Sequence, residues 1–337
     1  MPIRLPDERH FALNWQQQLA EAFTNIEELC EYLELAPDDL PVSIEASRDF
    51  PLRVPLSFAA SMEKGNANDP LLRQVLPVND ELIDFPGFSE NPVGDLEAVA
   101  VPGLLHKYYG RVLLINTGSC AINCRYCFRR NFPYQEQQLG KQQESNVINY
   151  IQSDNTISEV ILSGGDPLLL SDARLNHIIN EISAINHVKR IRIHSRLPIV
   201  LPARITDDLI KLLMNCGKPV VLVVHSNHVK EINERVVSAV NRIKHTGITL
   251  LNQSVLLKGI NDNATTLCDL SERLFAVGIL PYYLHLLDKA SGTGHFDVPE
   301  DKAKALISQI QNRLSGYLVP KLVKEVAGAE SKLALIS

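Results

Sequence analysis

The sequence predicts an α/β fold: an open, partial (β/α)6 barrel with a helical region before it and a short C-terminal segment that closes over the barrel mouth. Three observations indicate this fold. From about residue 111, short β-rich runs alternate with helical patterns, which is typical of parallel strands joined by right-handed crossovers. The alternation yields six units, fewer than a closed eight-unit barrel requires. Polar side chains follow each run, at the end of the strand where barrel enzymes carry their active sites.

Each predicted strand is a short run rich in β-branched and aliphatic residues. Strands are expected at residues 112–116, 159–163, 190–194, 220–225, 248–257 and 282–287. Helices, with apolar residues three and four positions apart, are expected at 172–185, 206–216, 229–246, 264–277 and 299–315. Because the carboxyl ends of parallel strands share one edge, the polar residues that follow them should form one reaction chamber.

A helical and loop-rich region precedes the barrel. Residues 15–33 repeat apolar side chains at the helix period, and a second helix is expected over 55–64. Proline, asparagine and aspartate make residues 79–97 mostly loop. We therefore expect an N-terminal region at 1–95, the barrel at 96–315 and a C-terminal segment at 316–337.

Composition excludes several classes of protein. A chain of 337 residues with 45% hydrophobic residues has enough apolar side chains for a substantial core. The formal net charge of −6 argues against broad contact with nucleic-acid phosphates. No apolar run is long enough to span a bilayer, and the first residues lack the apolar segment of a signal peptide. We expect a cytoplasmic protein without nucleic-acid or membrane partners.

Three cysteines within eight residues, Cys120, Cys124 and Cys127, carry the strongest signal for function. The spacing C-x3-C-x2-C provides three thiolates, one fewer than a fully ligated [4Fe–4S] cluster needs. The remaining iron is then free to chelate the amino and carboxylate groups of S-adenosylmethionine (SAM). Reductive cleavage of SAM by such a cluster, with an external electron donor, produces the adenosyl radical of radical-SAM enzymes, which this motif resembles.

Other interpretations of these thiols are weaker. A structural zinc site needs four ligands, usually in paired knuckles, and no second knuckle follows. Cys30, Cys216 and Cys268 stand alone within apolar helical patterns, so disulfides are not expected either.

Groups that contact SAM are expected at the ends of the next strands. Ser163, Gly164, Gly165 and Asp166 follow the second strand, where glycines permit close approach of backbone to ligand. The same residues also fit a plain turn with an aspartate cap. His225 and Gln253, after the fourth and fifth strands, are candidates for contact with the adenosine. The roles of His194 and Arg196 stay open.

Five segments of the sequence resemble the lysine 2,3-aminomutase family, and they occur in order from about residue 80 to the C-terminus. They are VPGLLHKYYGRVLLINTGSCAINCRYCFRR, ILSGGDPLLLSD, SRLPIVLPARIT, NQSVLLKGIND and YYLHLLDKASGTGHF. The resemblance is greatest to the family members that support (R)-β-lysylation of translation elongation factor P. It implies conversion of (S)-α-lysine to (R)-β-lysine, and a functional link to that factor and its lysyl-transferring ligase.

The resemblance also implies a second cofactor, pyridoxal 5′-phosphate (PLP), bound covalently to Lys332. Lys107, Tyr108 and Arg111 match the group that binds its phosphate, and they provide a point charge, a hydroxyl and a forked guanidinium. Family members usually have a run of glycines before the lysine, whereas this chain has only Gly328 nearby.

Substrate contacts follow from the same resemblance. Arg129 matches the residue that holds the carboxylate of L-lysine, with Arg130 as a neighbouring candidate. Asp288 and Glu325 match the acidic pair that binds the side-chain ammonium, although the family usually has aspartate at the second position. A buried ammonium needs such partners.

One family feature is not expected in this chain. Longer relatives bind zinc between subunits with a barrel-loop cysteine and a C-terminal extension, and Asn263 occupies the position of that loop cysteine. We therefore expect no structural zinc. Three other functions stay open: a radical-SAM enzyme without PLP, a metal- or redox-sensing protein, and a lysine aminomutase unrelated to translation.

Overall fold

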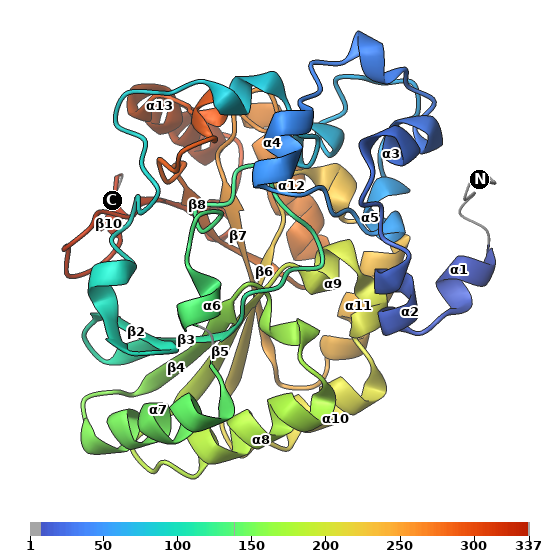
Figure 1. The fold of residues 1–337 in the computed structure, drawn as a ribbon. Helices are drawn as coiled ribbons and strands as arrows, with labels where there is room; N and C mark the ends of the chain where they lie inside the picture. The colour runs from blue at the N-terminus through green and yellow to red at the C-terminus, as the bar shows by residue number, and fades with distance from the viewer. Residues whose placement is uncertain (1–7, 138, 336–337) are drawn as a thin grey trace.

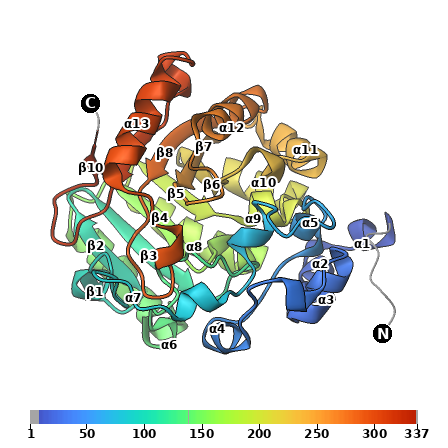
Figure 2. The same cartoon turned by 90° about the horizontal axis from the view of Figure 1, so that it is seen from above.

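A computed structural model describes residues 8–137 and 139–335, and within them the fold is built around one sheet of ten strands in sequential order (Figures 1 and 2). Six parallel strands form its centre: β3 (Arg111–Thr117), β4 (Glu159–Gly164), β5 (Arg190–Ser195), β6 (Val220–His225), β7 (Thr249–Val255) and β8 (Leu280–His285). These are the six predicted strands. The first and last strands of the sheet do not pair, so the barrel is open, as predicted.

Shorter strands flank the central six on both sides. β1 (Val99–Val101) and β2 (Leu104–Tyr108) are antiparallel and lead into β3, while β9 (Lys321–Lys324) runs parallel to β8 and pairs with antiparallel β10 (Leu333–Ala334). These four strands were not predicted from the sequence. The C-terminal segment thus reaches the barrel as two strands added to the sheet.

Helices cover the outer face of the curved sheet, as Figure 2 shows from above. They are α7 (Lys141–Ser153), α8 (Asp172–Ser183), α10 (Asp207–Met214), α11 (Glu234–Ile243), α12 (Ala264–Ala276) and α13 (Glu300–Gln311). Several begin at a side-chain cap: Ser171, Thr206 and Asn263 each accept a hydrogen bond from a backbone N–H of the first turn. The role of Asn263 is therefore to start α12, and the absence of structural zinc stays a prediction.

The helices differ from their predicted extents for local reasons. The helix expected at 229–246 begins instead at Glu234, after a 3-10 turn at Val229–Glu231, because Asn233 caps it. α7, between the first two central strands, was not predicted. Two short helices, α6 (Tyr134–Gln137) and α9 (Leu197–Val200), lie in loops that follow strands.

The N-terminal region packs beside α9 and α11 and shares their core. Its helices are α1 (Glu8–Ala12), α2 (Trp15–Ala20), α3 (Ile26–Tyr32), α4 (Ile44–Asp49) and α5 (Leu56–Ala59). The helix expected over 15–33 is two helices, because Phe23 forms a β-bridge with Val54 and Asn25 caps the second. Ser57 of α5 donates to the backbone oxygen of Val200 at 2.5 Å. The proposed domain boundaries stay a prediction.

No helix among the described residues combines the length and apolar character needed to cross a membrane.

Candidate active site

One cavity of about 560 Å³ lies inside the curved sheet and opens at the carboxyl ends of the strands. It also extends toward the start of the strands, since Arg111, Arg192 and Tyr282 line it. Every residue predicted for the site lines this one cavity: Lys107, Tyr108, Arg111, Cys120, Cys124, Cys127, Arg129, Ser163, Gly164, Gly165, Asp166, His225, Gln253, Asp288, Glu325 and Lys332. His194 and Arg196 line it too.

The loop after β3 carries Cys120, Cys124 and Cys127. The N-terminal region fixes this loop from outside: the backbone N–H of Arg125 donates to the oxygen of Gln74 at 2.8 Å. The Arg125 guanidinium is fully buried and pairs with Glu81 at 2.6 Å. A buried charge pair of this kind holds its backbone segments in one geometry, because separating the partners leaves an uncompensated charge.

The three thiols lie in surroundings that oppose their ionisation. Burial and the neighbouring thiolates raise the pKa of Cys120 well above its usual range, and burial raises the pKa of Cys127 to about 11. The described residues hold no three His, Cys, Asp or Glu side chains that converge on a single metal ion. A cubane cluster does not require such convergence, because each cysteine binds its own iron, and positively charged iron offsets the repulsion between thiolates. The donor set therefore fits a [4Fe–4S] cluster.

Arg196 connects the cysteine loop to a buried polar network. Its Nη1 lies 2.5 Å from the sulfur of Cys124 and also contacts the hydroxyl of Tyr126. Its Nη2 donates to Gln74 at 2.8 Å and lies 3.5 Å from Glu231. The guanidinium therefore places a fixed positive charge beside one predicted cluster ligand.

The glycines after β4 are required by the cysteine loop itself. A Cβ on Gly164 would lie 2.6 Å from the oxygen of Thr117, and Gly164 has a φ of +109°. A Cβ on Gly165 would lie 2.2 Å from the oxygen of Ser119. The N–H of Gly165 also donates to Thr117 at 2.6 Å. These glycines permit close approach of two loops, and contact with SAM stays a prediction.

The carboxylate of Asp166 is engaged within the protein. It accepts hydrogen bonds from the hydroxyl of Ser195 at 2.7 Å and from the backbone N–H groups of Arg196 and Leu197 at 2.8 and 3.1 Å. Burial raises the pKa of Asp166 to about 6, although these hydrogen bonds oppose the rise. Its side chain therefore fixes the loop that follows β5.

His225 and Gln253 lie side by side on adjacent strands, with their Nε2 atoms 2.9 Å apart. Burial and the charge of Arg196 lower the pKa of His225 to about 3, so the imidazole is neutral at physiological pH. A neutral imidazole and an amide suit hydrogen bonding to an uncharged nucleoside.

Five alternating charges form a continuous network along one wall of the cavity. Asp95 accepts from Arg129 at 2.6 Å and from Lys107 at 2.5 Å. Lys107 lies 3.0 Å from Glu325, which also contacts Lys332. Burial opposes ionisation of both acids, but the adjacent cations lower the pKa of Asp95 and lower that of Glu325 to about 2. The network joins the predicted substrate-binding and PLP-binding residues.

Asp288 differs from Glu325 in its ionisation. Burial, together with the negative charge of Glu325, raises the pKa of Asp288 to about 7. The two acids thus line the same cavity, but the pKa of Asp288 lies above the ordinary range of a carboxyl group and that of Glu325 lies below it. An arriving cation would favour the ionised form of Asp288.

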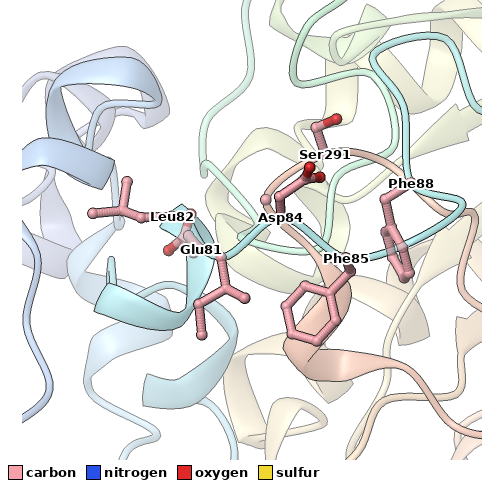
Figure 3. A pocket seen from close by; sticks show the side chains of 8 residues that line it. Glu81, Leu82, Asp84, Phe85, Phe88 and Ser291 are labelled. Atoms are coloured by element: carbon pink, nitrogen blue, oxygen red, sulfur yellow. The ribbon is translucent and has the colours of Figure 1, made fainter.

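Arg130, the alternative to Arg129, points away from the cavity. It pairs with Glu81 at 2.9 Å and donates to the oxygen of Gly292 at 3.0 Å. This contact joins the N-terminal region to the loop after β8, beside a second pocket of about 190 Å³ (Figure 3). Figure 3 shows Phe85 and Ser291 on opposite sides of that pocket. Arg129, which lines the cavity, is the arginine that can meet a bound carboxylate.

Sequence comparison agrees with this geometry. A model of the Radical SAM superfamily matches residues 114–270. The L-lysine 2,3-aminomutase of Escherichia coli (strain K12) is 48% identical over 323 residues, covering 96% of this chain and 94% of that protein. This chain belongs to the L-lysine 2,3-aminomutase family of radical-SAM enzymes. The family assignment made from the motifs is confirmed.

Other lysine 2,3-aminomutases match over nearly the whole chain. The one from Buchnera aphidicola is 46% identical over 321 residues, covering 95% of this chain and 94% of that protein. The one from Clostridium subterminale is 34% identical over 320 residues, covering 95% of this chain and 77% of that protein.

Residues that share the cavity of Lys332 fit the PLP expected in this aminomutase family. Arg111 forms no ion pair with any described residue, and its guanidinium lies 4.8 Å from the ring centroid of Tyr108. The buried hydroxyl of Tyr108 lacks a well-formed hydrogen bond. A guanidinium without an ion pair and a hydroxyl without a well-formed hydrogen bond are suitable donors for a phosphate. The primary amine of Lys332 lies in the same cavity.

Asp95 is a site residue that sequence reasoning missed. Its side chain is 4% exposed and contacts both Arg129 and Lys107. In the sequence it lies within a stretch rich in proline, asparagine and glycine, where aspartate usually forms turns. The cations predicted for the cavity, Lys107, Arg111, Arg129 and Lys332, outnumber the predicted acids Asp166, Asp288 and Glu325 by one, and this was the one available signal that a further acid takes part.

Proposed function

We propose that this enzyme is an L-lysine 2,3-aminomutase that converts (S)-α-lysine to (R)-β-lysine with a [4Fe–4S] cluster, SAM and PLP. The observation that carries the proposal is the single cavity shared by the cysteine triad, Lys332 and the acidic pair Asp288 and Glu325. The reaction exchanges an amino group on C2 with a hydrogen on C3, so it needs no net oxidant.

The charges in the cavity suit a substrate with a carboxylate at one end and an ammonium at the other. Arg129 offers a guanidinium for the α-carboxylate, and Asp95 holds that guanidinium at 2.6 Å. Asp288 and Glu325 offer carboxylates for the side-chain ammonium, which cannot be buried without partners. The contact between the ammonium of Lys332 and Glu325 supports this role, because Lys332 itself ends in an alkyl ammonium.

The protein residues position and shield the reacting groups. When bound, the cluster supplies the electron that cleaves SAM, and PLP delocalises an unpaired electron. Cys120, Cys124 and Cys127 would hold the cluster, Lys332 would hold PLP, and Lys107, Tyr108 and Arg111 would hold its phosphate. The apolar part of the lining, including Leu105, Val112 and Ile161, disfavours water beside the reacting groups.

An anaerobic assay tests the proposal. The full chain is reconstituted with iron, sulfide and PLP, then incubated with SAM, dithionite and labelled L-lysine, and the amino acids are separated by chiral chromatography. Labelled (R)-β-lysine is the expected product. Reductive cleavage of SAM without β-lysine, in protein that binds no PLP, would instead indicate a radical-SAM enzyme of another kind.

We further propose a cytoplasmic role in β-lysylation of translation elongation factor P. The motifs resemble family members with this role. The test adds the elongation factor, its lysyl-transferring ligase and the aminomutase product, and measures the mass added to the factor. A ligase that transfers the product no better than α-lysine would favour a metabolic aminomutase.

A further inference from the structure

Three histidines from different strands line the interior of the cavity: His194 on β5, His225 on β6 and His285 on β8. The rings of His194 and His225 lie 6.0 Å apart between centroids, and the ring of Tyr283 lies 5.4 Å from that of His285. The Nε2 atom of His225 has a partner, the amide of Gln253. The Nε2 atoms of His194 and His285 are buried and have no hydrogen-bond partner among the described residues.

Two unpartnered imidazole nitrogens are unusual in a protein interior. Burying a polar atom without a partner is unfavourable, so most such atoms are hydrogen-bonded to protein, ordered water or ligand. Both atoms belong to side chains that line the cavity of Lys332. Their rings therefore form part of the wall around any molecule inside it.

The charges around these two rings keep them neutral. Burial lowers the pKa of both His194 and His285 well below the usual range. For His194, the charges of His225, Arg192, Lys332 and Arg129 act in the same direction. For His285, Lys332 and His225 lower the pKa while Glu325 opposes them. A neutral imidazole presents one N–H donor and one nitrogen acceptor, which suits an uncharged or weakly basic polar atom.

The two histidines share the cavity of Lys332. The charge of Lys332 acts on both rings, so each lies within its electrostatic reach. The proposed phosphate donors Tyr108 and Arg111 belong to the hairpin of β2 and β3. A cofactor attached to Lys332 at its carbonyl carbon, with its phosphate on that hairpin, would have its ring hydroxyl on the flank away from the phosphate arm and its pyridine nitrogen at the end of the ring away from Lys332. These two atoms would then meet cavity residues other than Lys332 and that hairpin.

We propose that His194 and His285 bind the polar atoms of the pyridine ring of PLP through their unpartnered Nε2 atoms. This inference rests on the proposed function, because it assumes that Lys332 carries PLP. It gives a role in binding the pyridine ring to His194, whose role was left open by the sequence, and to His285, which was not predicted as a site residue. The competing ligand is the adenosine of SAM, and the experiment separates the two.

The test compares how tightly PLP binds to the wild type and to the variants H194F, H285F, H194Q and H285Q. Each protein is the full chain, reconstituted with its cluster. PLP is titrated anaerobically and fixed with borohydride, and the fraction of chains that carry it is read by intact mass. H106F is the matched control, because His106 bonds to Tyr150 at 2.9 Å and does not line the cavity.

Each phenylalanine variant should raise the dissociation constant of PLP about tenfold, the change expected from one lost hydrogen bond. Each glutamine variant should recover part of this loss, and H106F should match the wild type. Without added PLP, H194F and H285F should melt no lower than the wild type, because Phe removes an unpartnered polar atom. A purely structural role predicts lower melting temperatures instead.

The outcomes distinguish failure of the inference from failure of the proposed function. If borohydride fixes no PLP to the wild-type chain, the proposed binding of PLP is wrong. If the wild type is labelled and both phenylalanine variants bind PLP as tightly, the inference is overturned. Weakened binding of SAM, with unchanged binding of PLP, also overturns it and assigns the histidines to SAM.

Discussion

Lys107 on β2 lies 3.0 Å from Glu325, which follows β9, and this ion pair crosses the opening in the sheet that no backbone hydrogen bond closes. Nearby, the same opening is narrow enough that a Cβ on Gly94 would lie 3.0 Å from the Cβ of Ala327. Side chains that belong to the proposed active site therefore also join the two edges of the barrel. A substitution that removes one of these charges should therefore also change the shape of the cavity at this opening.

Removing the charge of Glu325 should weaken binding of L-lysine. In E325Q the substrate ammonium loses an ionised partner in a buried site, so KM should rise at least tenfold, in line with the 3–5 kcal/mol effects of breaking buried pairs. Steady-state kinetics with E325Q and the control E330Q, at an exposed position on the same segment, provides the measurement. Equal KM values for E325Q and wild type would contradict this role.

The change D95N should destabilise the enzyme and impair substrate binding. It leaves the buried cations Arg129 and Lys107 without their shared carboxylate, which should lower the free energy of unfolding by about 3 kcal/mol. Urea unfolding measures this change, with D84N, at an exposed position, as the control. A loss no greater than that of D84N would show that the network is not a stabilising contact.

Replacing Cys124 by alanine should abolish the cluster without unfolding the chain. Only two thiolates then remain, too few to hold the cluster, so iron and sulfide content should fall to near background. The control is C268A, which removes a thiol buried in α12 far along the chain from the motif. Retention of iron, sulfide and turnover by C124A would refute the cluster assignment.

Much of the site was predictable because strand order determines which residues meet. Cys120, Ser163, His225 and Gln253 lie far apart in the sequence, yet each lies within the last three residues of a parallel strand or shortly after one. Once six such strands were identified, their carboxyl ends had to share one edge. The chemistry of each residue could then be assigned from its type and from the family resemblance.

Other features could not be predicted, because they depend on contacts between residues far apart in the sequence. β10 is only two residues long, and its pairing with β9 depends on the tertiary position of the C-terminal segment. The partners of Asp166 are about thirty residues away in sequence, so its capping role in the loop after β5 could not be read from Ser-Gly-Gly-Asp. The same holds for Asp95 and its two cations.

The change G165A should displace the cysteine loop. Its Cβ would lie 2.2 Å from the backbone oxygen of Ser119, which has no flexible end that can move aside. We expect weaker retention of iron and a free energy of unfolding lower by about 1–3 kcal/mol, as for overpacked interiors. G316A is the control, because nothing lies within 4 Å of a Cβ at Gly316. Normal iron content and stability in G165A would show that the two loops can separate.

The raised pKa of Asp288 should make stability depend on pH in a way that D288N removes. The pKa of Asp288 is about 7 in the folded enzyme against an ordinary value of 3.8, so the folded state holds a proton that the unfolded chain releases between these values. Its stabilising contribution is present below about pH 4 and is lost as pH rises through 7.

We therefore expect D288N to become more stable relative to the wild type between pH 5 and pH 8, by on the order of 2 kcal/mol, since one pKa unit corresponds to about 1.4 kcal/mol. Urea unfolding of both proteins at several pH values measures the difference. Glu325 does not contribute, because its lowered pKa places its transition below pH 5, and the histidines titrate in both proteins. A stability difference that stays constant from pH 5 to pH 8 would show that Asp288 is already ionised, and that the cavity supplies it with a cationic partner before lysine arrives.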